Sequence, residues 1–103
     1  MSYNVDPAMF GARPDFLLKV RGWSMRDAGI MDGDFLAVKK VDSAKNGQIV
    51  VALVDDSEVT LKRLRRQGAS TVLEPCNQTH QPQTYPAHMV KVQGRLVGLL
   101  RRY

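Results

Sequence analysis

Several residue types that mark common protein classes are scarce in this 103-residue sequence. The one cysteine, Cys76, cannot form an internal disulfide, and with only His80 and His88 nearby it lacks the ligands of a structural zinc site. The longest apolar run, IVVALV at 49–54, is far shorter than a membrane span, and the N-terminus lacks the pattern of a secretory signal. We therefore predict a cytoplasmic protein with no metal, no cofactor and no membrane partner.

Aromatic residues are also few, which bears on the meaning of the positive charge. The formal net charge of +5 comes mostly from arginines, several of them in LKRLRRQ at 61–67. Such a cluster could attract nucleic acid, yet no aromatic side chain interleaves with it to stack on bases. We favour a solvated strand edge that discourages aggregation, and a non-enzymatic β module that binds nucleic acid remains an alternative.

The chain is short enough for a single domain, and its pattern favours strands. Turn signals recur at short intervals, and the segments between them are rich in aliphatic and β-branched residues. This predicts a mostly β, compact, partly open barrel-like domain of mixed sheets with one short helical turn. Strands are predicted near 16–21, 34–40, 48–54, 58–66, 70–74 and 88–101, the last bent or bulged at Gly94 and Gly98. The proline-rich residues 75–87 are expected to form a long loop over the sheet.

The helical turn falls in the segment GWSMRDAGIMDGD at 22–34. Ser24 can cap this turn, Asp27 occupies the place of the second capping-box residue, and Gly29 can end it. A serine at the start of a turn is either an ordinary polar residue or a nucleophile. The second possibility requires a base to take the proton of its hydroxyl.

Neither histidine is a good candidate for that base, because both flank the proline-rich loop and neither has a carboxylate beside it in the sequence. A lysine kept neutral by burial can serve instead, since desolvation lowers the pKa of its amine. Of the six lysines, Lys62 in EVTLKRL at 58–64 is the best placed, because Thr60 and Leu64 share its strand face. Lys62 could equally be one more residue of a basic edge strand.

The two segments together resemble the serine-lysine self-cleaving peptidase family, which includes the C-terminal domain of LexA repressors, phage repressors and the polymerase accessory protein UmuD. Residues 22–34 are similar to the family's pattern of glycine, any residue, Ser-Met, a short turn, Gly-Ile and Gly-Asp. Residues 58–64 are similar to its lysine strand. The likeness runs from about residue 4 to the C-terminus and leans towards LexA. It implies that Ser24 is the nucleophile and Lys62 the general base.

The resemblance also implies an autoproteolytic activity that cleaves an Ala-Gly bond in a connecting segment of an SOS-response transcriptional repressor. The one Ala-Gly pair here, Ala28-Gly29, lies within the nucleophile motif, so we expect the cleaved bond to lie outside this chain. Backbone amides around Ser24 and Met25 are candidates for oxyanion support. Val59 and Thr60 could pair with an extended substrate segment by strand addition.

Partners follow from the same resemblance: a homodimer, a RecA filament on single-stranded DNA as co-protease, and operator DNA bound only through an N-terminal domain outside these residues. The run HMVKVQGRLVGLLRRY at 88–103 has apolar residues on both faces and would leave an unpaired edge in a monomer, which also favours a dimer. Residues 1–15 are predicted to be an extended lead-in, and 16–103 the catalytic and dimerisation domain. A UmuD-like subunit of a translesion polymerase is the main alternative. Signal peptidases share the dyad but need a membrane anchor.

Overall fold

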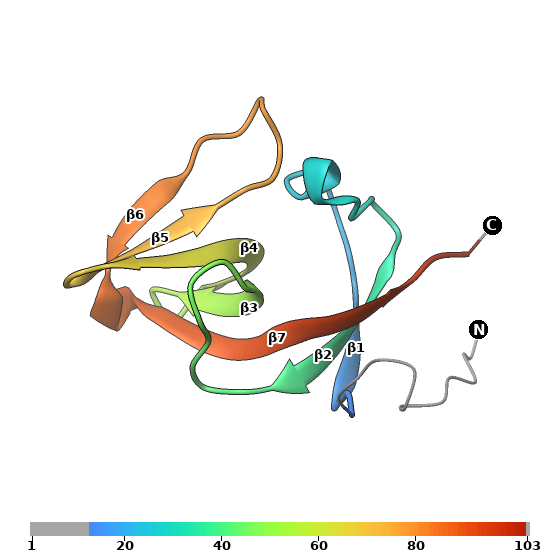
Figure 1. Cartoon of the computed structure of the whole chain (residues 1–103), viewed down its shortest axis with the longest axis horizontal. Helices are drawn as coiled ribbons and strands as arrows, with labels where there is room; N and C mark the ends of the chain where they lie inside the picture. Colours follow the sequence, from blue (N-terminus) through green and yellow to red (C-terminus); the bar gives the residue numbers. More distant parts are fainter. Residues whose placement is uncertain (1–12, 103) are drawn as a thin grey trace.

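A computed structural model describes residues 13–102, which form one seven-stranded antiparallel sheet (Figure 1). The strand order is β1-β2-β7-β3-β4-β5-β6. The strands are β1 (Phe16–Lys19), β2 (Phe35–Lys40), β3 (Ile49–Val54), β4 (Glu58–Gln67), β5 (Ser70–Glu74), β6 (Gln83–Pro86) and β7 (Val90–Leu100). The mostly β, incompletely closed architecture is confirmed. Every strand pair is antiparallel, where mixed sheets were expected. Four of these pairs join strands that follow one another in the chain, and a short connection between paired strands favours the antiparallel direction.

β3 supplies the centre of the core, because both of its faces are buried. Its continuous apolar sequence is typical of a strand that is covered on both sides. Val51 packs in one cluster with Leu36 and Val38 of β2, whereas Val50 packs in a second cluster with Leu64 of β4. Successive residues of β3 therefore serve different halves of the core.

β7 runs through the middle of the sheet between β2 and β3 and crosses the whole molecule (Figure 1). Its register shifts beside the pair of Ala37 with Gly98 on one side and beside the pair of Val51 with Gly94 on the other. The bulges predicted near these two glycines are confirmed. β7 lies between β2 and β3, but from Leu96 to Leu100 it pairs only with β2, and from Val90 to Val92 only with β3. Each half of the strand thus has one side without a partner strand among the described residues; β1 and β6 are the outer strands.

Two expectations about the strands after β3 are wrong. Residues 75–87 contain β6 and the first residue of the short helix η3 (Ala87–Met89) instead of one long loop. The sequence does not predict β6, because QTYP lacks the alternation of apolar and polar residues that is typical of strands. It also ends in a proline, which an outer strand tolerates. The second error concerns β4, which lies between β3 and β5 in the sheet rather than at its edge, although only Arg63 pairs with both neighbours. Arg65 and Arg66 are exposed on this inner strand.

The lead-in predicted for residues 1–15 falls largely outside the described residues. At its end, Asp15 already belongs to the sheet: its N–H donates to Val38 O at 2.8 Å, and its carboxylate accepts the Lys40 N–H at 2.7 Å. Within residues 13–102 no helix has the length and apolar character needed to cross a membrane.

Candidate active site

Ser24 lies in the connection between β1 and β2, just before the short 3-10 helix η2 (Arg26–Ala28). Met25 occupies the N-cap position and no side chain caps the helix, so the predicted capping role of Ser24 is wrong. The predicted end at Gly29 is confirmed, since this residue has a left-handed φ of 80°. The side chains of Met25 and Ile30 are 2% exposed and pack in the core. These two anchors hold the turn while Ser24 stays half-buried at its start.

An ion pair between the buried Asp34 and the partly exposed Arg101 fixes the far end of the same turn. The Asp34 carboxylate accepts the Met31 N–H at 2.8 Å and pairs with Arg101 through Nε at 2.8 Å and Nη2 at 2.7 Å. The same guanidinium donates to the Gly29 carbonyl at 2.7 Å. Hydrogen bonds from Arg101 lower the pKa of Asp34 below its ordinary value, against the opposing effect of burial. The end of the chain thereby clamps the turn that carries Ser24.

Lys62 reaches the site from the middle of β4. β3 pairs with residues Glu58 to Arg63 of this strand, but β5 pairs only from Arg63 onward. The stretch 58–62 is therefore hydrogen-bonded along one side and open along the other. Ladder bonds to β3 set the position of Lys62, since its backbone lies opposite Val50 in the core.

The structure brings Ser24 and Lys62 together, as the two motifs predicted. Lys62 Nζ lies 3.3 Å from Ser24 Oγ and 2.6 Å from Thr60 Oγ1 (donor to acceptor in both cases). Burial lowers the pKa of the Lys62 amine, whereas the nearby Glu58 carboxylate raises it by a smaller amount. The site therefore holds a hydroxyl within hydrogen-bond distance of an amine whose charged form is disfavoured.

Two cavities meet at this pair of side chains. One, of about 350 Å³, lies between the β1 side and β4 and is lined by Leu18, Val20 and Val59 among others. The other, of about 280 Å³, is lined by Glu58 and His80, together with residues of β5 and β6. Ser24, Thr60 and Lys62 line both. An extended chain that runs from one cavity into the other would pass over the Ser24 hydroxyl.

The histidines lie differently from Lys62. His80 lines the smaller cavity, where its Nδ1 is 3.2 Å from Thr79 Oγ1, while His88 is exposed on η3. Among the described residues, the Ser24 hydroxyl is hydrogen-bonded to Lys62 and to neither imidazole. Within the same residues no three His, Cys, Asp or Glu side chains are grouped so that they could hold a metal ion.

Backbone amides at the start of the turn complete the site. In the part of the chain that the structure describes, neither the Ser24 N–H nor the Met25 N–H donates a hydrogen bond to the protein. The Met25 carbonyl, in contrast, accepts from the Ala28 N–H at 3.1 Å and the Ile30 N–H at 3.3 Å. The two amides thus remain available to an oxygen bound beside Ser24.

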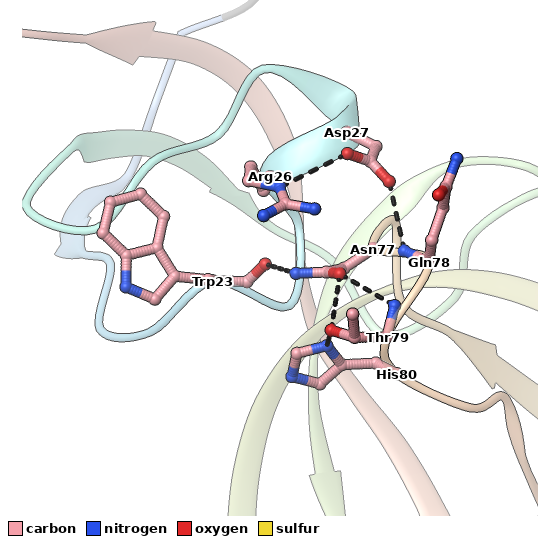
Figure 2. A network of polar contacts seen from close by, with 7 residues as sticks. All are labelled: Trp23, Arg26, Asp27, Asn77, Gln78, Thr79 and His80. Atoms are coloured by element: carbon pink, nitrogen blue, oxygen red, sulfur yellow. Dashed lines mark hydrogen bonds and ion pairs between the residues drawn. The ribbon is translucent and has the colours of Figure 1, made fainter.

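The connection between β5 and β6 packs against the turn that carries Ser24 through polar contacts that the sequence did not indicate (Figure 2). The Asp27 N–H donates to the Cys76 carbonyl at 2.6 Å, and the Asp27 carboxylate accepts the Gln78 N–H at 3.2 Å. Asp27 therefore links two segments instead of closing a capping box. The buried Asn77 donates from Nδ2 to the Trp23 carbonyl at 2.7 Å.

Comparison with known proteins agrees with this geometry. A family model described as Peptidase S24-like matches residues 1–97. The chain belongs to this family. It is 59% identical over 95 residues to a LexA repressor of Granulibacter bethesdensis and 55% identical over 102 residues to one of Paramagnetospirillum magneticum. A LexA repressor of Gluconacetobacter diazotrophicus is 54% identical over 95 residues.

These matches include nearly all of this chain but less than half of each relative. They cover 92%, 99% and 92% of the chain, and 39%, 43% and 38% of the respective repressors. The chain thus spans about two fifths of the length of the curated relatives it matches. Within the family, its structure corresponds to a LexA-type C-terminal domain.

Proposed function

We propose that this chain is the self-cleaving serine peptidase domain of a LexA-type SOS-response repressor, with Ser24 as nucleophile and Lys62 as general base. The observation that carries the proposal is the 3.3 Å contact between Lys62 Nζ and Ser24 Oγ inside a family of peptidases. Two further observations support the proposal: the pKa of the Lys62 amine is lowered, and Ser24 and Lys62 lie where two cavities meet.

The reaction begins when the neutral Lys62 amine takes the proton of the Ser24 hydroxyl and the oxygen attacks the alanine carbonyl carbon of an Ala-Gly bond. Lys62 then gives this proton to the departing glycine nitrogen, which leaves an ester on Ser24. A water molecule then loses a proton to Lys62 and attacks the ester carbonyl. Lys62 returns this proton to Ser24 Oγ as the ester bond breaks, which releases the new carboxyl group and restores the neutral amine. Thr60 Oγ1, which lies 2.6 Å from Nζ, keeps the amine in place between the two half-reactions.

The N–H groups of Ser24 and Met25 are proposed to stabilise the negative charge that develops on the carbonyl oxygen. Their lack of a protein acceptor among the described residues supports this role. The structure thereby also suggests why Met25 is buried. Its buried side chain anchors the turn, and its backbone N–H is thereby held where the carbonyl oxygen of the substrate is proposed to lie.

The substrate segment is proposed to bind along the open side of β4. Residues 58–62 have unpaired backbone groups there, and strand addition uses such groups for affinity. The Val59 side chain is 61% exposed and lines the larger cavity, so ordinary sheet packing does not account for it. The backbone of Thr60 lies on this open side of β4, and its hydroxyl accepts a hydrogen bond from Lys62 Nζ. Thr60 therefore serves both substrate binding and the placement of the amine.

The partners proposed for the whole repressor are a second copy of the chain, operator DNA bound by a separate N-terminal domain, and a RecA filament on single-stranded DNA. They rest on the resemblance to LexA repressors and not on a surface of these residues. All three relatives named above are repressors, which supports this function over a polymerase accessory subunit.

A trans-cleavage assay tests the proposed function directly. The chain is incubated with a peptide of about 20 residues that carries a central Ala-Gly bond, and the products are followed by mass spectrometry. We expect cleavage at that bond, a transient acyl adduct on Ser24, and no cleavage of the matched peptide with Ala-Pro in its place. Absence of cleavage at high peptide concentration over the range of pH in which the lysine is neutral would refute the proposal.

A further inference from the structure

Asn77 is the one buried residue of the β5–β6 connection whose side chain reaches the backbone of the nucleophile turn. It is 7% exposed, although asparagine is usually a surface residue. Its Nδ2 donates to the Trp23 carbonyl at 2.7 Å, across 54 residues of sequence. Figure 2 shows this contact at the centre of the network, between the turn and the loop.

The orientation of the Asn77 amide is fixed by its other contacts. Oδ1 accepts the Thr79 N–H at 3.0 Å and the Thr79 hydroxyl at 2.8 Å. A backbone N–H can only donate, so the atom that faces it must be the amide oxygen. The NH₂ group consequently faces Trp23, where it meets a carbonyl that can only accept.

The Trp23 carbonyl belongs to the peptide unit that carries the Ser24 N–H. A peptide unit is planar, and in the trans form its C=O and N–H point in opposite directions. The carbonyl is held by Asn77 Nδ2 and, at 3.1 Å, by the Arg26 N–H. Fixing this oxygen therefore fixes the direction of the Ser24 N–H on the other side of the plane.

We propose that Asn77 is a positioning residue for the active site: it orients the Trp23–Ser24 peptide so that the Ser24 N–H points at the developing oxyanion. This inference rests on the proposed function. Donors that stabilise an oxyanion act only when they are aligned before the reaction, so loss of the Asn77 donor lowers the rate of acylation while leaving substrate binding intact. Lys62 is not involved, because within residues 13–102 its amine contacts the Ser24 and Thr60 hydroxyls and no side chain of this network.

The test compares two variants of Asn77 with a matched control. Asn77→Asp keeps the acceptor for Thr79 but presents an oxygen to the Trp23 carbonyl, and Asn77→Ser removes the amide altogether. Thr79→Val is the control, because it removes the hydroxyl bond to Oδ1 and leaves the bond to Trp23 untouched. Trans-cleavage kinetics, thermal unfolding and the ¹⁵N-¹H spectrum of the Ser24 amide are measured for each.

We expect kcat to fall about 10- to 100-fold in both Asn77 variants, somewhat less than for the loss of a whole oxyanion donor. KM and the pH midpoint of the rate should stay as in the wild type, and Thr79→Val should keep a kcat within about twofold. An equal loss in Thr79→Val, a loss confined to KM, or a shifted pH midpoint would overturn the inference. Unfolding of both Asn77 variants would also overturn it, since Asn77 would then serve stability and not alignment.

The Ser24 amide resonance separates this inference from the proposed function. If the wild-type chain cleaves nothing, the proposed function fails, and the spectrum still reports on the peptide. A displaced Ser24 resonance in the Asn77 variants and an unchanged one in Thr79→Val would support the orienting contact. Identical Ser24 resonances in all four proteins would refute it.

Discussion

Ser24 and Lys62 reach the same point from two different kinds of structure. Lys62 belongs to a strand that backbone hydrogen bonds hold in register against β3. Ser24 belongs to a turn whose shape depends on particular side chains: two buried anchors, the Asp34–Arg101 pair and the contacts to the β5–β6 connection. A sheet register survives many side-chain changes, whereas such a turn does not. We therefore expect substitutions in the turn to damage the chemistry, some of them together with stability, and those in the sheet to cost stability alone.

Removing the proposed nucleophile gives the largest expected effect. Ser24→Ala should lower the cleavage rate by about 10⁴-fold or more, because it removes the hydroxyl that is proposed to attack the alanine carbonyl. The free energy of unfolding should change little, since the hydroxyl is half-buried and makes one long hydrogen bond. Rates come from peptide cleavage and stability from urea unfolding. Residual activity above about one hundredth of the wild-type rate would contradict the assignment.

Breaking the clamp on the turn should cost the most stability. The Asp34 side chain is 3% exposed and its partner Arg101 is 31% exposed, so Asp34→Asn leaves a partly buried guanidinium without its carboxylate. The expected loss is about 3 kcal/mol of unfolding free energy at pH 7. Asp56→Asn is the control, because its ion pair with Lys91 is exposed and should contribute little.

The pH dependence of the same pair has a definite sign. Because Arg101 lowers the pKa of Asp34 in the folded state, the unfolded state binds a proton more readily. The stabilisation is complete above the ordinary carboxyl pKa and is lost as the pH falls through the lowered value. Urea unfolding at a series of acidic pH values should therefore show a steeper loss in the wild type than in Asp34→Asn. If the unfolding free energies of the wild type and Asp34→Asn fell in parallel as the pH decreased, Asp34 would not contribute to the pH dependence of stability.

On the sheet side, Gly94→Ala should destabilise the fold without changing the chemistry. A Cβ at this position would lie 2.4 Å from Val38 Cγ1 and 3.0 Å from the Lys39 carbonyl oxygen. The expected cost is about 2 kcal/mol, typical of overpacking in a core. The double variant Gly94→Ala/Val38→Ala should lose less than the sum of the single variants, because the second change removes the clash. A Gly94→Ala variant that cleaved more slowly although its free energy of unfolding was unchanged would contradict the expectation that substitutions in the sheet affect stability and not the chemistry.

The smallest expected effect comes from Glu58, which shares the open stretch of β4 with Lys62. Its carboxylate raises the pKa of the Lys62 amine, so Glu58→Gln should move the rise of cleavage rate towards lower pH. Glu74→Gln is the control, because this carboxylate pairs with Arg65 and lines neither cavity at the dyad. A shift towards higher pH in Glu58→Gln would contradict the electrostatic account.

Much of this site could be predicted from the sequence. Short motifs gave Ser24 and Lys62 as partners, and the alternation of β4 favoured Lys62 among the lysines. Turn signals and the aliphatic and β-branched residues between them also predicted strands near 34–40, 48–54 and 58–66, and the structure has them at Phe35–Lys40, Ile49–Val54 and Glu58–Gln67. These features depend on neighbours in the chain, which is why local patterns report them.

The features that the sequence did not predict depend on contacts between distant segments. β7 is an inner strand because β2 and β3 pair with it, which no property of residues 90–100 alone reveals. Asn77 in PCNQT has the composition of a surface loop, and its burial follows from packing against Trp23. Thr60 was assigned to substrate binding, and its hydroxyl contact to Lys62 emerges only when both side chains are placed on the strand.

The dependence of the single-turnover cleavage rate on pH tests the central claim, that Lys62 is the base, most directly. In the wild type and in His80→Ala the rate should rise as the Lys62 amine loses its proton, at a pH below the ordinary pKa of lysine because burial disfavours the charged form. Lys62→Ala should show no measurable cleavage at any pH. A rise that follows a histidine pKa and disappears in a folded His80→Ala variant would contradict the account.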